Sequence, residues 1–98
     1  MITLIVSLWL QNEDIAGFEA FEGKAATIMA RHGGKIERVI RLENPSAELP
    51  FEVHVLTFPD AQAFAAYRTD PALTALAEMR QQVIARTTVW TGQDVEGY

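Results

Sequence analysis

The sequence of 98 residues contains no cysteine, which excludes disulfide bonds, thiolate catalysis and cysteine-ligated zinc. Small secreted domains are often held together by disulfides, so their absence favours a reducing cytoplasm as the location. Only eight Lys and Arg residues stand against thirteen Asp and Glu, which gives a formal net charge of −5. Because a broad nucleic-acid surface needs clustered basic residues, we expect no nucleic-acid partner.

The sequence also lacks a hydrophobic run long enough to span a membrane. The apolar stretch from Met1 to Leu10 is about half the length that a transmembrane helix needs. It carries neither a basic leader nor a small-residue cleavage site, so we predict a strand there and no membrane partner. Hydrophobic residues make up 49% of the chain, and its length fits a single domain over residues 1–98.

Hydrophobic patterns predict a strand, a helix and a second strand in the first half of the chain. Residues 2–10 are rich in β-branched and aromatic side chains, as in a central strand that is buried on both faces. From Ile15 to His32 apolar residues recur at three- and four-residue steps, which predicts an amphipathic helix. Gly33-Gly34 ends this helix. Residues 35–42 alternate charged and apolar side chains, as an edge strand does.

The second half repeats this order after a proline-containing loop over residues 43–50. Residues 51–58 form the third predicted strand, and Pro59-Asp60 opens a second helix. Thr69-Asp70-Pro71 interrupts that helix, because Asp suits an N-cap and Pro the first helical position. A further helix is predicted to run to about Ala85. Residues 86–91 form the fourth predicted strand, and an acidic tail follows over residues 92–98.

This order predicts an α+β domain with the ferredoxin-like βαββαβ arrangement. Right-handed crossovers give a four-stranded antiparallel sheet in the order four, one, three, two, with the helices on one face. The other face also carries apolar side chains, including Ile5 and Trp9, and therefore requires burial. Packing against a second copy would supply it, so we expect a homodimer. The alternative is a monomer with an exposed apolar sheet face.

A set of residues runs from the end of the first predicted helix to the last helix: His32-Gly33-Gly34, Phe58-Pro59-Asp60, Phe64, Tyr67, Asp70-Pro71 and Arg80. In these residues the sequence resembles the dimeric α/β-barrel superfamily, which includes the antibiotic-biosynthesis-type monooxygenases. Within it, the sequence is most similar to a family of small bacterial proteins of unknown function. The resemblance implies a dimeric α/β barrel but does not select an activity, because the superfamily includes oxygenases, isomerases and haem proteins. The haem-degrading relatives place a histidine on the second helix, which has none here, so no haem is implied.

Arg80 is the first candidate site residue, because it lies on the same helical stripe as Leu73, Leu76 and Val83. A guanidinium that faces a core must be paired or must face a cavity. One interpretation is a cationic anchor for a carboxylate or enolate ligand. The alternatives are a structural ion pair, with a carboxylate such as Glu22 or Glu52, and a side chain that extends to solvent.

Glu52, His54 and Arg38 form the second candidate group. Glu52 and His54 share a strand face, and simple hairpin pairing would bring Arg38 close to His54 on that face. A histidine beside a carboxylate can serve as a general base. The alternatives are a polar network across the dimer interface and exposure at the sheet edge.

Tyr67 and Trp9 are candidates to line a ligand pocket with Arg80 and Arg38. The two histidines are far apart and without a carboxylate pair between them, so we expect neither a metal nor a cofactor. Three functions stay open, and whether the protein is an enzyme stays open with them. They are a small-molecule-binding homodimer, a cofactor-independent monooxygenase or isomerase acting on an enolisable aromatic or polyketide-like compound, and a structural or regulatory assembly protein.

Overall fold

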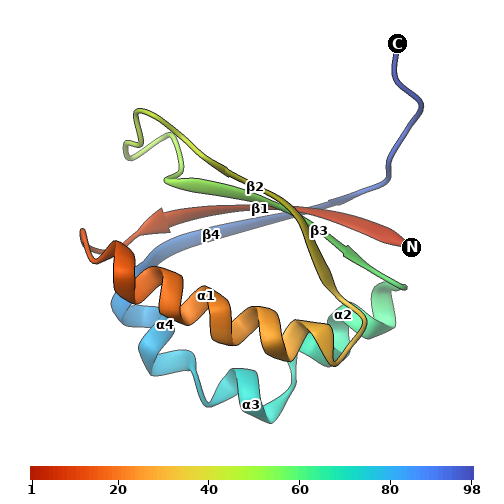
Figure 1. The fold of residues 1–98 in the computed structure, drawn as a ribbon, viewed down its shortest axis with the longest axis horizontal. Helices are drawn as coiled ribbons and strands as arrows, with labels where there is room; N and C mark the ends of the chain where they lie inside the picture. The colour runs from red at the N-terminus through yellow and green to blue at the C-terminus, as the bar shows by residue number, and fades with distance from the viewer.

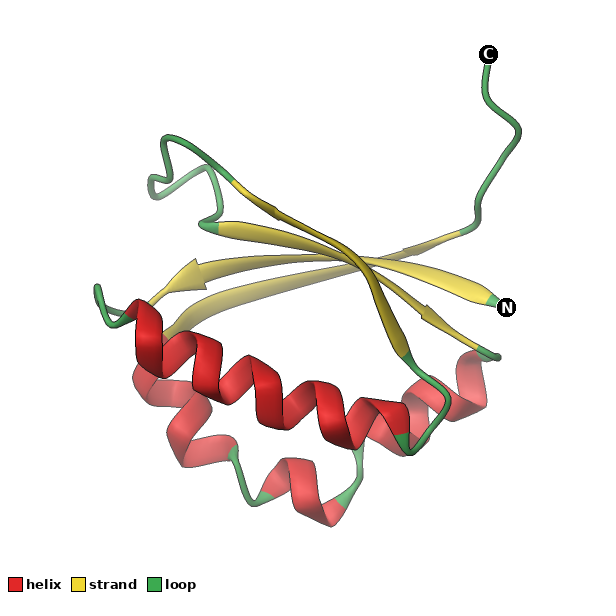
Figure 2. Ribbon diagram, in the orientation of Figure 1, coloured by secondary structure: helices red, strands yellow, loops and turns green.

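One antiparallel sheet and a layer of helices form the domain, described here from a computed structural model of residues 1–98 (Figure 1). All helices lie on one face of the sheet, and no element of the chain covers the other face (Figure 2). The sheet order β2-β3-β1-β4 confirms the predicted order and the α+β, ferredoxin-like class. The elements are β1 (Ile2–Leu10), α1 (Ile15–Ala30), β2 (Lys35–Arg41), β3 (Glu52–Phe58), α2 (Ala61–Arg68), α3 (Pro71–Thr74), α4 (Ala77–Val83) and β4 (Ile84–Gly92).

Helix α1 begins and ends at the residues that local chemistry favours. The Asp14 carboxylate accepts a hydrogen bond from the Gly17 amide at 2.8 Å and caps the helix. After the last turn, Gly33 adopts a φ of +74°, a left-handed conformation that glycine takes without strain. At Gly34 a Cβ atom would overlap the Phe58 ring, so the close approach of this turn to β3 also requires glycine.

The predicted long helix up to Ala85 is wrong in detail. Two short helices, α3 and α4, replace it, and the strand begins at Ile84 rather than at Arg86. The backbone at Leu76 (φ −92°, ψ 3°) leaves the helical conformation and changes the chain direction. Leu73 and Leu76 both still pack against the core, so tertiary packing rather than local propensity sets this break.

The prediction that Arg38 lies close to His54 on the same sheet face is also wrong. Strand β2 contains a bulge between Ile36 and Arg38, which leaves Glu37 as an extra residue. After the bulge Arg38 pairs with Val55 and Val39 pairs with His54. Because neighbouring residues of a strand point to opposite faces, this one-residue shift places Arg38 on the sheet face away from His54.

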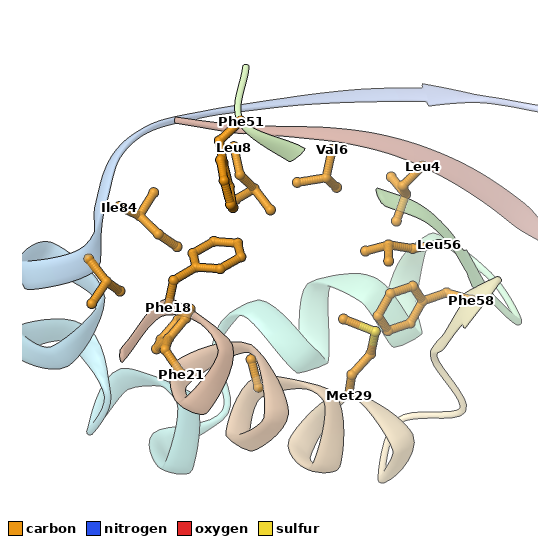
Figure 3. Packing of buried hydrophobic residues seen from close by; sticks show 12 residues of the cluster. Leu4, Val6, Leu8, Phe18, Phe21, Met29, Phe51, Leu56, Phe58 and Ile84 are labelled. Carbon is orange, nitrogen blue, oxygen red and sulfur yellow. The ribbon is translucent and has the colours of Figure 1, made fainter. Parts of the chain in front are cut away.

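The core lies between α1 and the sheet face that it covers. Side chains of β1 and β3 point toward α1: Leu8 lies above Phe18, and Leu4 and Leu56 lie above Met29, beside Phe58 (Figure 3). Phe18 is only 1% exposed. None of the helices has the length and apolar content that crossing a membrane would need.

Candidate functional site

A cavity of about 530 Å³ lies between the helix-covered face of the sheet and the helices. Val89 of β4 borders it and remains 39% exposed, so the β4 side of the cavity is open to solvent. Its wall is mostly apolar, with contributions from β1, β3, β4 and all four helices. The polar and charged lining residues are Glu22 of α1, His54 of β3, Tyr67 and Arg68 of α2, Thr74 of α3, Arg80 of α4 and Thr87 of β4.

His54 is held between two carboxylates. Its Nε2 atom lies 2.7 Å from Oε1 of Glu52, and both residues are only 4% exposed. Arg41 Nε donates to the other oxygen of Glu52 at 2.8 Å. The His54 Nδ1 atom makes no hydrogen bond and lies 3.8 Å from Oε2 of Glu22, another residue of the cavity wall.

The environment of Glu22 changes its acidity. Burial raises the pKa of this carboxyl above its usual value, the charge of His54 opposes that rise, Glu52 adds to it, and Arg80 opposes it. Burial also raises the pKa of Tyr67 to about 12, with a smaller contribution from Glu22. The Tyr67 hydroxyl therefore stays protonated at neutral pH and can donate a hydrogen bond. The cavity thus holds a carboxyl shifted toward neutral pH and a neutral phenol.

Arg80 supplies a cation that no carboxylate neutralises directly. Its Nη2 atom donates to the Thr87 hydroxyl at 2.6 Å, and no Asp or Glu oxygen lies within ion-pair distance. The suggested ion pair with Glu22 or Glu52 is therefore absent, and Glu52 pairs with Arg41 instead. Arg80 is exposed, as the alternative of a side chain that extends to solvent predicts, and its guanidinium is available at the cavity to a ligand oxyanion.

The predicted site residues fall into two groups in the structure. Arg80, Tyr67 and His54 line the cavity, and Glu52 lies behind His54. Trp9 and Arg38 lie on the uncovered face of the sheet, so they cannot line the same cavity. The alternation along β1, in which Leu8 faces the helices, turns Trp9 away from them.

Sequence reasoning named Glu22 only as a possible ion-pair partner of Arg80, and it did not name Arg41 at all. Glu22 follows Phe18 by four residues and precedes Ala25 by three, a spacing that places all three on one helix face. That signal was present, although the charge of Glu22 suggested an exposed position. The contact of Arg41 with Glu52 had no comparable signal, because it depends on the bulge in β2.

Trp9 borders a second hollow, of about 340 Å³, with Gln11, Ser46 and Phe51 among its other lining residues. The Trp9 Nε1 atom is buried and has no hydrogen-bond partner, and the Arg86 guanidinium stacks over the indole ring at 4.4 Å. No three acidic or histidine side chains gather as a metal ion would require, here or elsewhere in the chain.

No protein-family model matches the sequence, and no curated protein matches it either. Solved structures do match over nearly the whole chain. A protein of unknown function from Rhodopseudomonas palustris superposes with a TM-score of 0.79 at 18% identity, covering 98% of this chain and 83% of its own. SnoaB, a cofactor-independent oxygenase from Streptomyces nogalater, gives 0.73 at 17% identity, covering 98% and 94%.

A third match connects the chain to a described fold. A dabb family protein with a ferredoxin-like fold from Mesorhizobium loti gives a TM-score of 0.67 at 17% identity, covering 97% of each chain. Identities this low establish the fold and leave the activity open. The chain therefore has the ferredoxin-like fold that its resemblance to the dimeric α/β-barrel proteins implied.

Proposed function

We propose that this protein is a homodimer that binds a small organic molecule in the cavity between its sheet and its helices. The observation that carries the proposal is an apolar hollow of about 530 Å³ with Arg80, His54 and Glu22 in its wall. Ligand sites are typically of this size and mostly apolar, with a few polar groups that fix orientation. A structural or regulatory assembly protein would need no such hollow.

The lining indicates the kind of ligand. Arg80 and Arg68 make part of the wall cationic, while most of the remaining wall is apolar and aromatic. A guanidinium binds carboxylate, phenolate and enolate oxygens well, because its donors form a planar fork. The ligand that fits has an apolar, aromatic-sized body and one acidic oxygen.

The uncovered sheet face supports the dimer. Ile5 lies at its centre, in register with Val55 on one side and Trp90 on the other. Trp90 is 69% exposed in the single chain. An apolar sheet face of this kind is buried in most proteins, and a two-fold pair is the commonest arrangement that buries it. In that dimer each copy would keep its own cavity on the outer side of its sheet.

A second candidate is a cofactor-independent monooxygenase or isomerase acting on an enolisable compound. The observation that favours it is the Glu52–His54 contact at 2.7 Å, which orients the imidazole with its free Nδ1 toward the cavity side. A histidine oriented by a carboxylate is a common arrangement for proton transfer. The structural likeness to the oxygenase SnoaB is compatible with this candidate and does not distinguish it from simple binding.

Binding can be tested by thermal unfolding with naphthalene-1-carboxylate and its neutral analogue naphthalene. A ligand at a hundred times its dissociation constant adds about 2.7 kcal/mol of apparent stability. We expect the carboxylate to raise Tm more than naphthalene does. Ala77→Trp should abolish the shift, because Ala77 lines the cavity. Ala65→Trp is the matched control, since Ala65 is also exposed on a helix but lies outside the cavity wall.

Unchanged Tm with the carboxylate, or an equal shift in both tryptophan variants, would contradict binding in this cavity.

A further inference from the structure

Four charged or ionisable side chains form a row of contacts that leads from the surface to the cavity. Arg41, at the solvent end, is 43% exposed and contacts Glu52 at 2.8 Å. Glu52 contacts His54 at 2.7 Å, and His54 faces Glu22 at 3.8 Å. Basic and acidic groups therefore alternate along this row of contacts. Glu22 is its last member.

Glu22 is better placed than the other members to meet a ligand. The side chains of Glu52 and His54 are each only 5% exposed, whereas that of Glu22 is 20% exposed. Glu52 does not line the cavity at all, and the His54 ring lies between two carboxylates. Glu22 lines the cavity together with Tyr67 and Arg80.

Charged and titratable groups from three neighbouring elements act on Glu22 or are affected by it. His54 and Glu52 belong to β3, Tyr67 to α2 and Arg80 to α4. When Glu22 is ionised, its negative charge offsets the charge of the unpaired Arg80 guanidinium. When it is protonated, Arg80 has no counter-charge in the cavity. The positive charge of Arg80 can therefore be offset in two ways: by an ionised Glu22, or by a bound anion when Glu22 is neutral.

We infer that Glu22 exchanges a proton with the ligand, and that the ligand enters as a neutral O–H or C–H acid, such as a phenol or a β-diketone. This inference rests on the proposed function. In the step, the ligand O–H or C–H bond breaks and its proton moves to a carboxylate oxygen of Glu22. The electron pair stays on the ligand as a phenolate or enolate oxyanion, which faces Arg80. No oxidant or reductant takes part.

The transfer conserves the charge of the site. One carboxylate becomes neutral as one oxyanion forms, so no net charge is created beside Glu22, whose side chain is only 20% exposed. Burial keeps the proton affinity of Glu22 higher than that of an exposed glutamate, as a general base requires. His54, held by Glu52 and Arg41, is a positioning residue that tunes this affinity. A proton held on Glu22 can return to another carbon of the same enolate, which is an isomerisation.

The experiment uses para-nitrophenol, because its phenolate absorbs visible light and its neutral form does not. The probe is titrated with wild-type protein at a pH below the probe's own pKa, and binding is measured independently by calorimetry. We expect the bound probe to show the phenolate band without releasing a proton to the buffer. Glu22→Gln should bind the probe as the neutral phenol, and the band should be lost. Glu19→Gln, an exposed carboxylate on the same helix, should match wild type.

His54→Asn tests the positioning role. Loss of the His54 charge should raise the pKa of Glu22 further, because that charge opposes the effect of burial. A carboxylate with a higher proton affinity takes the ligand proton more readily, so the phenolate band should extend to lower pH than in wild type. If Glu22→Gln folds poorly, Glu22→Asp keeps a carboxylate farther from the ligand and should lower the fraction of bound phenolate.

The outcomes separate this inference from the proposed function. A full phenolate band in Glu22→Gln, or binding to wild type as neutral phenol, would overturn the proton transfer and leave ligand binding standing. An unshifted pH dependence in His54→Asn would overturn the role of His54. If wild type binds no probe at all, the proposed function fails and the inference fails with it.

Discussion

His32 and Asp70 join the end of α1 to the start of α3 through a contact of 2.7 Å between Nε2 and Oδ2. The other Asp70 oxygen accepts a hydrogen bond from the Ala72 amide at 2.8 Å and caps α3. One carboxylate therefore both starts a helix and ties it to α1. Tyr67, which borders the cavity, lies beside this contact, with its ring centroid 6.4 Å from that of His32.

The His32–Asp70 contact predicts a specific loss of stability in acid. The hydrogen bond from His32, and then that from Ala72, lower the pKa of Asp70 below its usual value. A lowered folded-state pKa means that the contribution is complete above the ordinary aspartate value of about 3.9 and is lost as pH falls through the folded-state value. Asp70→Asn keeps a capping side chain but should reduce this acid dependence, as urea melts between neutral and acidic pH can show.

Asp60→Asn is the control for that experiment. Asp60 caps α2 through the Ala63 amide at 2.8 Å and has no histidine partner. Its replacement should change the acid dependence of stability less than Asp70→Asn does, because it removes no contact with a histidine. Equal pH profiles for Asp70→Asn and wild type would contradict the prediction.

The Arg41–Glu52 contact should matter for stability more than its exposed position suggests. Arg41→Met removes one partner of a carboxylate that is 4% exposed, so the free energy of unfolding should fall by about 1–3 kcal/mol, the cost of an unsatisfied buried group. Glu19→Gln removes only the exposed partner of Arg41, and such pairs contribute about 0–1 kcal/mol. Denaturant melts measure both changes. Equal losses would show that Glu52 does not depend on Arg41.

Arg80→Leu should change stability little and ligand binding strongly. Arg80 has no carboxylate partner and only one side-chain hydrogen bond, so its replacement should shift the free energy of unfolding by no more than about 1 kcal/mol. In the same variant, naphthalene-1-carboxylate should raise Tm no more than naphthalene does. Arg31→Leu, at the exposed end of α1, should keep that shift. A loss of about 3–5 kcal/mol in Arg80→Leu would instead indicate a buried ion pair.

The proposed dimer makes a prediction about the centre of the uncovered sheet face. Ile5→Arg places a charge between Val55 and Trp90, so light scattering should change from twice the chain mass to a single chain mass. Val39→Arg is the control, because Val39 is 53% exposed and pairs with His54 on the opposite face. A well-folded wild-type monomer at micromolar concentration would contradict the dimer.

The sequence by itself determined the order of strands and helices and the sheet order that follows from it. The signals are local: Asp14, Asp60 and Asp70 cap helices, and Gly33 supplies a left-handed turn. Each depends on a few neighbouring residues, so each is readable from the chain alone. The alternation along β1 likewise placed Leu4, Val6 and Leu8 on one face, and all three are buried.

Only the tertiary structure decided which charged residues meet. The bulge at Glu37 turns Arg38 away from His54 and pairs Arg41 with Glu52, and a bulge depends on the partner strand rather than on its own sequence. The break at Leu76 follows from packing against the core in the same way. Glu22 meets His54 only because α1 packs on the sheet face that carries His54, a contact between residues 32 positions apart. Patterns of neighbouring residues do not predict such a contact, because only the fold brings these residues together.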